Sequence, residues 1–104
     1  MWIFFKEGMV SIVQHEHDKD IILIRARTKA ALHAFCSVIE LGVIRDKDFD
    51  YEYRIFMLRS DFEKILLEKT REIDYTNFKD SITDNRWKII CNNVWATVKY
   101  YYQK

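Results

Sequence analysis

The chain has 104 residues, 17 of them basic and 16 acidic, which gives a formal net charge of +1. The length predicts a single domain spanning residues 1–104. Hydrophobic residues at 49% and charged residues at 32% exclude a disordered chain. A near-neutral charge makes general nucleic-acid binding unlikely, because such binding needs a basic surplus, although a local patch stays open. With two glycines and no proline, the chain lacks a glycine-rich phosphate loop.

The first residues are apolar, but Lys6 and Glu7 interrupt them too early for a signal peptide or a membrane span. The cysteines, Cys36 and Cys91, lie far apart in the sequence and within apolar helical patterns, where we expect them to be reduced and largely buried. These features predict a cytoplasmic protein with no membrane association.

Residues 2–5, 10–14 and 21–27 are predicted as three strands, because short apolar runs alternate there with polar turns. Residues 15–20 form the polar hairpin loop between the second and third strands. In the third strand, the period of two places Ile22, Ile24 and Ala26 on one face and Arg25 and Arg27 on the other.

Thr28 is expected to cap a helix that runs to about residue 41, and Gly42 suits a left-handed stop. A polar loop, residues 45–50, then leads into a strand over residues 51–58, which is rich in aromatic and β-branched side chains. Ser60 and Glu63 have the spacing of a capping box for the next helix.

Residues 74–82 are predicted as a short helical turn with loop, followed by a last helix from about residue 84 to residue 102. The apolar stripe of this helix is wide enough to cover a sheet face, and further aromatic residues lie beside it. The stripe consists of Trp87, Ile90, Cys91, Val94, Val98 and Tyr101, and Trp95 and Tyr102 widen it.

The predicted order is therefore β-β-β-α-β-α-α, with strands early in the chain and helices late. This order favours an α+β fold in which helices back one face of a small antiparallel sheet. A split β-α-β relative of the ferredoxin-like arrangement is the specific architecture that we expect.

The most metal-like segment is His15-x-His17 with Asp18 and Asp20, since alternate residues of an extended chain point the same way. A solvated hairpin tip is the favoured interpretation, and no metal or cofactor is expected. No nucleophile and base have convincing spacing, so an enzyme is the less favoured class.

Basic and aromatic residues form the more informative set. If the third and fourth strands are neighbours, Arg25, Arg27 and Arg54 converge at one end of the sheet, where guanidinium groups suit carboxylate or phosphate oxygens. The favoured alternative pairs these arginines with Glu52, Asp50 and Asp74 as structural ion pairs. The candidate binding residues are Arg25, Arg27, Tyr53, Arg54, Tyr75, Asn77, Lys79 and Trp95.

Several short motifs follow one another along the chain. In order, they are Met1-Trp2-Ile3-Phe4, Ser11-Ile12-Val13-Gln14-His15, Ile24-Arg25-Ala26-Arg27, Asp50-Tyr51-Glu52-Tyr53-Arg54, Ile73-Asp74-Tyr75-Thr76-Asn77-Phe78-Lys79-Asp80 and Val94-Trp95. With these motifs the chain resembles a family of short, uncharacterised bacterial and phage-encoded proteins. The resemblance spans nearly the whole chain, and residues 74–79 are its most specific part.

No activity is assigned to that family, so the resemblance implies no mechanism. It marks as polar positions of interest Arg25, Arg27, Tyr53, Arg54, Asn77 and Lys79. The chain departs from the family pattern because it lacks proline in segment 74–78 and before the fourth strand, where we expect a less rigid loop.

Two functions are favoured, and a hydrolytic enzyme is kept as a third only because Asp, His and Arg are plentiful. The first is a non-catalytic protein-binding module, such as a small phage or host regulator that occludes a larger protein partner, or a chain that self-associates. The alternative is binding of a phosphate, a nucleotide or a nucleic-acid end through the Arg, Lys and Tyr cluster.

Overall fold

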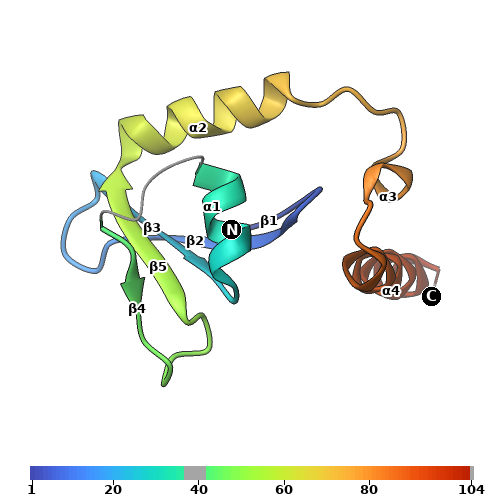
Figure 1. Cartoon of the computed structure of the whole chain (residues 1–104), viewed down its shortest axis with the longest axis horizontal. Coiled ribbons are helices and arrows are strands. Elements are labelled where there is room, and N and C mark those ends of the chain that lie inside the picture. Colours follow the sequence, from blue (N-terminus) through green and yellow to red (C-terminus); the bar gives the residue numbers. More distant parts are fainter. Residues whose placement is uncertain (37–41, 104) are drawn as a thin grey trace.

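The computed structural model describes residues 1–36 and 42–103. Its centre is a five-stranded antiparallel sheet with the strand order β1-β2-β3-β5-β4 (Figure 1). The strands are β1 (Trp2–Phe5), β2 (Gly8–Gln14), β3 (Ile21–Ala26), β4 (Ile44–Arg45) and β5 (Tyr53–Leu58). The helices are α1 (Lys29–Cys36), α2 (Arg59–Arg71), α3 (Phe78–Ser81) and α4 (Asn85–Tyr102).

This architecture confirms the predicted α+β class with an antiparallel sheet. Strands β3 and β4 both pair antiparallel with β5, so they are parallel to each other and are connected through α1. The chain therefore contains one split β-α-β unit, which is half of a ferredoxin-like arrangement. Helix α2 leads to α3 and α4 and not to a further strand of the described chain.

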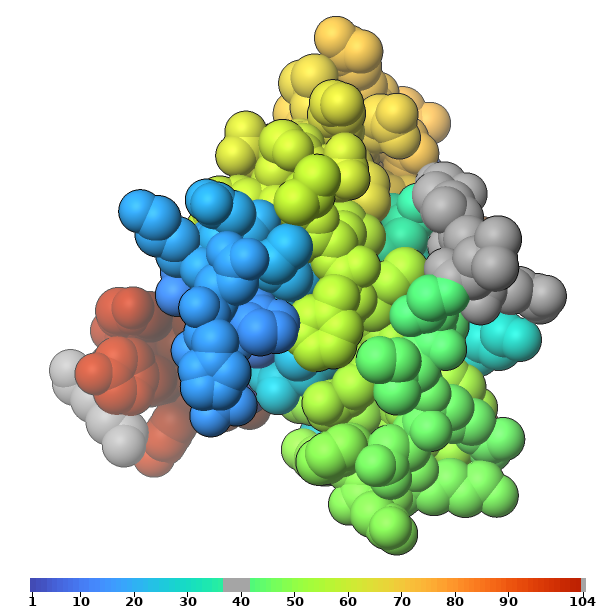
Figure 2. Space-filling view, turned by 90° about the vertical axis from the view of Figure 1, so that its left-hand side faces the viewer, coloured from blue at the N-terminus to red at the C-terminus, as the bar shows by residue number. Residues whose placement is uncertain are grey.

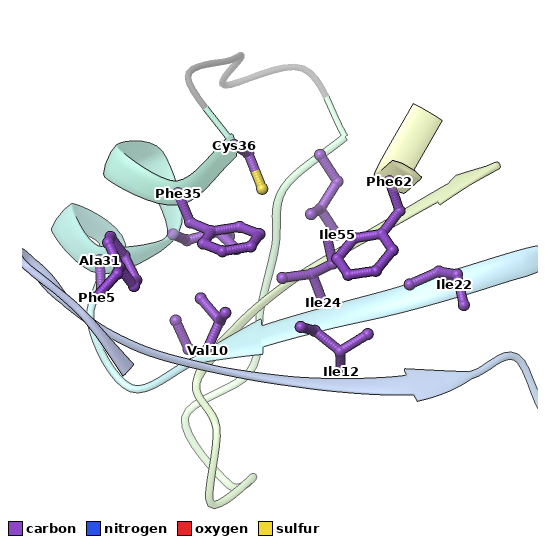
Figure 3. Close-up of a cluster of buried hydrophobic side chains, with 12 residues drawn as sticks. Phe5, Val10, Ile12, Ile22, Ile24, Ala31, Phe35, Cys36, Ile55 and Phe62 are labelled. Atoms are coloured by element: carbon purple, nitrogen blue, oxygen red, sulfur yellow. The ribbon is translucent and has the colours of Figure 1, made fainter. Parts of the chain in front are cut away.

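Helices α1 and α2 lie on the same side of the sheet (Figure 1). Phe35 from α1 and Phe62 from α2 point towards Val10 and Ile24 of the strands, as Figure 3 shows. The period of two selects the strand residues of this core, as the sequence predicts. The buried cluster consists of Phe5, Val10, Ile12, Ile22, Ile24, Ala26, Ala31, Leu32, Phe35, Cys36, Ile55 and Phe62.

Both cysteines are unpaired and buried, as predicted. Burial in this core raises the pKa of the Cys36 thiol to about 11, although the nearby Lys69 ammonium acts in the opposite direction. Burial also raises the pKa of Cys91, which lies on α4.

The start of α1 follows the prediction closely. The Thr28 hydroxyl accepts a hydrogen bond from the Ala31 amide at 3.1 Å, so Thr28 is the N-cap. Gly42 has a φ of 95°, the left-handed conformation expected there. The predicted end of this helix near residue 41 lies outside the described residues.

The capping box predicted at Ser60 and Glu63 is wrong. Strand β5 continues directly into α2, whose N-cap is Leu58 with an extended backbone and no side-chain cap. The Arg59 amide instead donates to the Asp20 carbonyl at 2.7 Å, so the β2–β3 hairpin provides an acceptor at the start of the helix. Another difference is β4, which was not predicted; it ends at the first residue of the predicted polar loop and pairs with β5.

Helix α4 has the predicted bounds, because the Asp84 carboxylate caps it by accepting from the Trp87 amide at 2.9 Å. The expectation that its apolar stripe covers a sheet face is wrong, since Cys91 is the one buried residue of this helix. Figure 1 shows α4 set apart from the sheet and from the other long helix. The radius of gyration of 14.8 Å exceeds the value of about 13 Å expected for a compact domain of this length.

Within the described ranges, none of the helices has both the length and the apolar character needed to cross a membrane.

Candidate functional site

Helix α4 is attached to the rest of the chain through its first two turns. The Trp87 ring stacks on Phe4 of β1 at a centroid distance of 5.6 Å and an interplanar angle of 12°. The Trp87 Nε1 group also donates to the Phe5 carbonyl at 2.8 Å. One turn further on, Cys91 is 5% exposed. These contacts fix the first half of α4 beside the edge strand β1.

The second half of α4 continues the same apolar stripe, which is more exposed there. Val94, Trp95, Val98 and Tyr101 follow Cys91 at helical spacing, with exposed fractions of 39%, 51%, 50% and 66%. From Val94 to the end of the helix, this surface extends for about 13 Å. A continuous apolar surface of this kind is typical of a binding interface. We call these four residues the outer stripe.

Two basic side chains lie beside Trp95 of the outer stripe. The Lys79 ammonium lies 4.0 Å from the Trp95 ring centroid, and the Lys99 ammonium lies 5.0 Å from it. Helix α4 itself contains no acidic residue between its first and last positions. The surface is therefore aromatic, apolar and positively charged.

An open pocket of about 430 Å³ lies between α3 and α4. Its lining consists of Phe4, Thr76, Asn77, Phe78, Lys79, Cys91, Val94 and Trp95. Asn77 is the N-cap of α3, where its side-chain oxygen accepts from the Asp80 amide at 3.1 Å. The structure thus brings three of the predicted site residues, Asn77, Lys79 and Trp95, to one place.

Tyr75 lies near this pocket without lining it. Its ring contacts Phe78 at a centroid distance of 6.0 Å, and the Lys6 ammonium lies 5.2 Å from its centroid. The sequence contained the residues of the pocket but gave no sign that Phe4 would join them, because that contact is between the two ends of the chain.

The second group of predicted site residues lies on the sheet face that α1 and α2 leave uncovered. Arg25 and Arg54 are direct cross-strand partners, and Ser11 is the partner of Arg25 on β2. The prediction that these two arginines share the face opposite Ile24 is confirmed. We call this surface the open face; it comprises Ser11, Val13, Leu23, Arg25, Arg54 and Phe56.

The loop between β4 and β5 covers the two arginines with aromatic rings. Arg54 lies 4.1 Å from the Phe49 ring centroid, and Arg25 lies 4.9 Å from that of Tyr51. Arg27 lies 5.2 Å from the same Tyr51 ring, so the three predicted arginines do converge. Figure 2 shows this loop (green) and α4 (red) on opposite sides of the molecule.

The predicted ion pairs are present only in part. Arg27 pairs with Asp50 at 3.3 Å, as expected, but Glu52 pairs with Arg45 at 2.8 Å and Asp74 with Lys6 at 3.1 Å. Arg25 and Arg54 have no carboxylate within ion-pair distance in the part of the chain that the structure describes. The structural ion-pair interpretation therefore accounts for Arg27 and not for the other two.

The structure does not bring Tyr53 to the arginines. Tyr53 pairs with Ala26 and packs against the core on the covered face, where the Arg45 guanidinium lies 5.5 Å from its ring centroid. Tyr51 lies beside the arginines instead, because it precedes β5 and is free of the strand's alternation. Phe49, an aromatic residue in an otherwise polar loop, was a signal that sequence reasoning missed.

The two histidines of the hairpin are 6.2 Å apart between ring centroids. The His15 Nδ1 atom accepts hydrogen bonds from the His17 and Asp18 amides, at 3.0 and 3.1 Å. His15 thus stabilises its own turn. Among residues 1–36 and 42–103, no group of three or more His, Cys, Asp or Glu side chains is placed to hold a metal ion.

Comparisons of the chain with protein-family models, with curated proteins and with solved structures found no significant match. The resemblance to a family of short bacterial and phage-encoded proteins therefore stays a prediction.

Proposed function

We propose that this chain is a non-catalytic protein-binding module that binds an acidic, amphipathic helical segment of its partner along the outer stripe of α4. The observation that carries the proposal is the contrast within one helix face. The face is sealed at Trp87 and Cys91 and uncovered from Val94 to Tyr101. Helices commonly bind in such apolar surfaces through side chains spaced three and four residues apart.

The charge around the outer stripe supports the choice of partner. The Lys99 ammonium of α4 and the Lys79 ammonium of α3 both lie at the Trp95 ring of the stripe, and α4 has no acidic residue to balance them. An acidic partner is attracted to such a surface, whereas a second copy of α4 would place cations against cations. The proposal therefore favours a different protein over self-association.

Isothermal titration calorimetry can test the proposal with the intact chain and a synthetic helical peptide. The peptide carries leucine on one face and glutamate beside that face; a second peptide has the same leucines with lysine in place of glutamate. We expect saturable binding of the glutamate peptide and much weaker binding of the lysine peptide. Equal binding of the two peptides, or of neither, would contradict the proposed charge complementarity.

Two matched variants show where the peptide binds. Val98→Asp puts a charge into the outer stripe, and Ile89→Asp puts the same charge at a position 60% exposed on the other side of α4. Val98→Asp is expected to weaken binding by about tenfold or more, and Ile89→Asp to leave it nearly unchanged. Equal losses would show that α4 does not bind the peptide through the stripe.

Light scattering and vesicle-binding assays test two other possible occupants of the outer stripe, a second copy of the chain and a membrane surface. A dimer that Val98→Asp dissociates would assign the outer stripe to a second copy of the chain. Binding to anionic lipid vesicles without binding to the glutamate peptide would assign it to a membrane surface. Either result would overturn the proposed protein partner.

A further inference from the structure

Arg25 and Arg54 on the open face form a second feature, independent of α4. The two residues are directly opposite each other on neighbouring antiparallel strands. Like charges in this position are destabilising unless something compensates them. Arg27 and Arg45 have carboxylate partners, but in the described chain Arg25 and Arg54 have none. The pair therefore concentrates two uncompensated positive charges on a small area.

The surrounding side chains hold both guanidinium groups in place. Phe49 lies over Arg54, Tyr51 lies over Arg25, and Ser11 Oγ accepts from Arg25 Nη2 at 2.8 Å. The serine itself is 1% exposed, so this hydrogen bond is anchored in the protein. A guanidinium fork that is already oriented loses less conformational entropy when it binds a ligand.

The hydrogen-bonding capacity of the pair is not used up within the chain. The Nε atoms of both arginines are buried and have no hydrogen-bond partner. The terminal nitrogens of Arg54 donate no hydrogen bond within the described ranges, and those of Arg25 donate one, to Ser11. The terminal nitrogens, unlike the buried Nε atoms, are therefore the donors that can bind a ligand.

The neighbouring residues are apolar. The next residues on the same face, two positions further along each strand, form an adjacent cross-strand row. This row consists of Val13, Leu23 and Phe56. The Phe56 side chain is 42% exposed and that of Val13 is 36% exposed. A ligand that places an oxyanion on the arginines would place its carrier group against this row.

We propose that Arg25 and Arg54 bind a single phosphomonoester group carried by an apolar or aromatic moiety, such as an aryl phosphate. The two positive charges match the charge of nearly −2 of a phosphomonoester at neutral pH. The planar forks fit its oxygens, and Phe56 with Val13 contacts the carrier. A nucleic-acid strand is a poorer fit, because the flanking Arg27 is already paired with Asp50 and no line of free cations follows among the residues that the structure describes.

The direct test is a calorimetric titration of the intact chain with phenyl phosphate, inorganic phosphate and phenyl sulfate. We expect phenyl phosphate to bind most tightly: inorganic phosphate lacks the ring, and phenyl sulfate has one negative charge less. Phenyl sulfate binding as tightly as phenyl phosphate would contradict the charge match. No saturable binding up to about 10 mM phenyl phosphate would overturn the site itself.

Three arginine variants locate the binding. Arg54→Gln is expected to weaken phenyl phosphate binding by about tenfold or more, since hydrogen bonds to a charged group are lost. Arg54→Lys keeps the charge without the fork and should restore only part of the affinity. Arg45→Gln is the matched control, because Arg45 lies on the covered face and pairs with Glu52.

A thermal melt of each variant shows whether it is folded. If Arg54→Gln does not fold, Arg54→Lys decides the question: wild-type affinity in that variant would contradict bidentate recognition. An equal loss in Arg45→Gln would show that the anion binds elsewhere. The site does not depend on the outer stripe, so Val98→Asp should leave phenyl phosphate binding intact while it weakens peptide binding.

Discussion

The two halves of α4 have the same pattern of apolar residues and different surroundings. In the first half, Trp87 stacks on Phe4 and hydrogen-bonds to Phe5, and Cys91 is buried, although Ile90 of the same stripe is 49% exposed. In the second half, Val98 and Tyr101 continue the stripe into solvent. The difference shows that an apolar stripe indicates that a helix face is suited to contact another apolar surface. It does not indicate whether the same chain provides that surface.

The largest effect is expected from a substitution of Trp87, in the packed half of α4. Trp87→Ala removes the stacking on Phe4 and the hydrogen bond to the Phe5 carbonyl, and we expect it to lower the free energy of unfolding by about 3 kcal/mol. Tyr101→Ala removes a ring of similar type from the outer half and should change it by less than about 0.5 kcal/mol. Urea unfolding followed by circular dichroism measures both. Equal losses would mean that the outer half is packed as well.

The thiol of Cys36, which is buried in the core, provides a reference for the effect of full burial on stability. The pKa of Cys36 is raised to about 11 from an ordinary value of 9.0, mainly by burial. The neutral thiol therefore stabilises the folded state fully below pH 9, and the stabilisation is lost as the pH rises towards 11. Relative to Cys36→Ala, the wild-type chain should lose about 2 kcal/mol over this window. Unfolding curves at pH 8, 9.5 and 11 measure this difference, and a constant difference would contradict burial of the thiol.

Thiol reactivity compares the two halves of α4 directly. Burial raises the pKa of Cys91, so at pH 8 little thiolate is present and access is restricted. A cysteine introduced by Val98→Cys lies on the outer stripe and should react with iodoacetamide about tenfold faster or more. Mass spectrometry of the alkylated peptides gives both rates in one sample. Similar alkylation rates at the two positions would show that the two halves of α4 do not differ in accessibility.

The smallest expected effect concerns the contact between α3 and the outer half of α4. The Lys79 ammonium lies 4.0 Å from the Trp95 ring centroid, and Lys79→Ala should cost about 0.5–1 kcal/mol of unfolding free energy. Lys64→Ala on α2 is the control, because that ammonium is 4.0 Å from Asp61 and highly exposed. A loss as large in Lys64→Ala would show that the ring contact adds nothing to stability.

Local patterns in the sequence were sufficient for much of the fold. Alternation along β3 placed Ile24 in the core and Arg25 on the other face, and the Thr28 and Asp84 caps marked where α1 and α4 begin. These features depend on a few neighbouring residues. The helix α2 was different, because its start depends on the Asp20 carbonyl of a distant hairpin and not on Ser60.

The candidate site was predictable only in its pieces. Parity along the strands could pair Arg25 with Arg54, since both residues are inside regular strands. It could not place Phe49 and Tyr51 over them, because loop residues follow no alternation. Nor could periodicity show that α4 would leave Val98 uncovered, since that depends on where the sheet ends at β1.

Hydrogen–deuterium exchange of α4, with and without the glutamate peptide, tests the central claim most directly. In the free chain, the amides of residues 94–102 should exchange much faster than those of residues 89–91, because most side chains of the outer half are exposed. Saturating peptide should slow the exchange of residues 94–102 and leave that of 89–91 unchanged. If residues 94–102 are as protected as 89–91 in the free monomer, or stay unprotected with bound peptide, the outer stripe is not the binding surface.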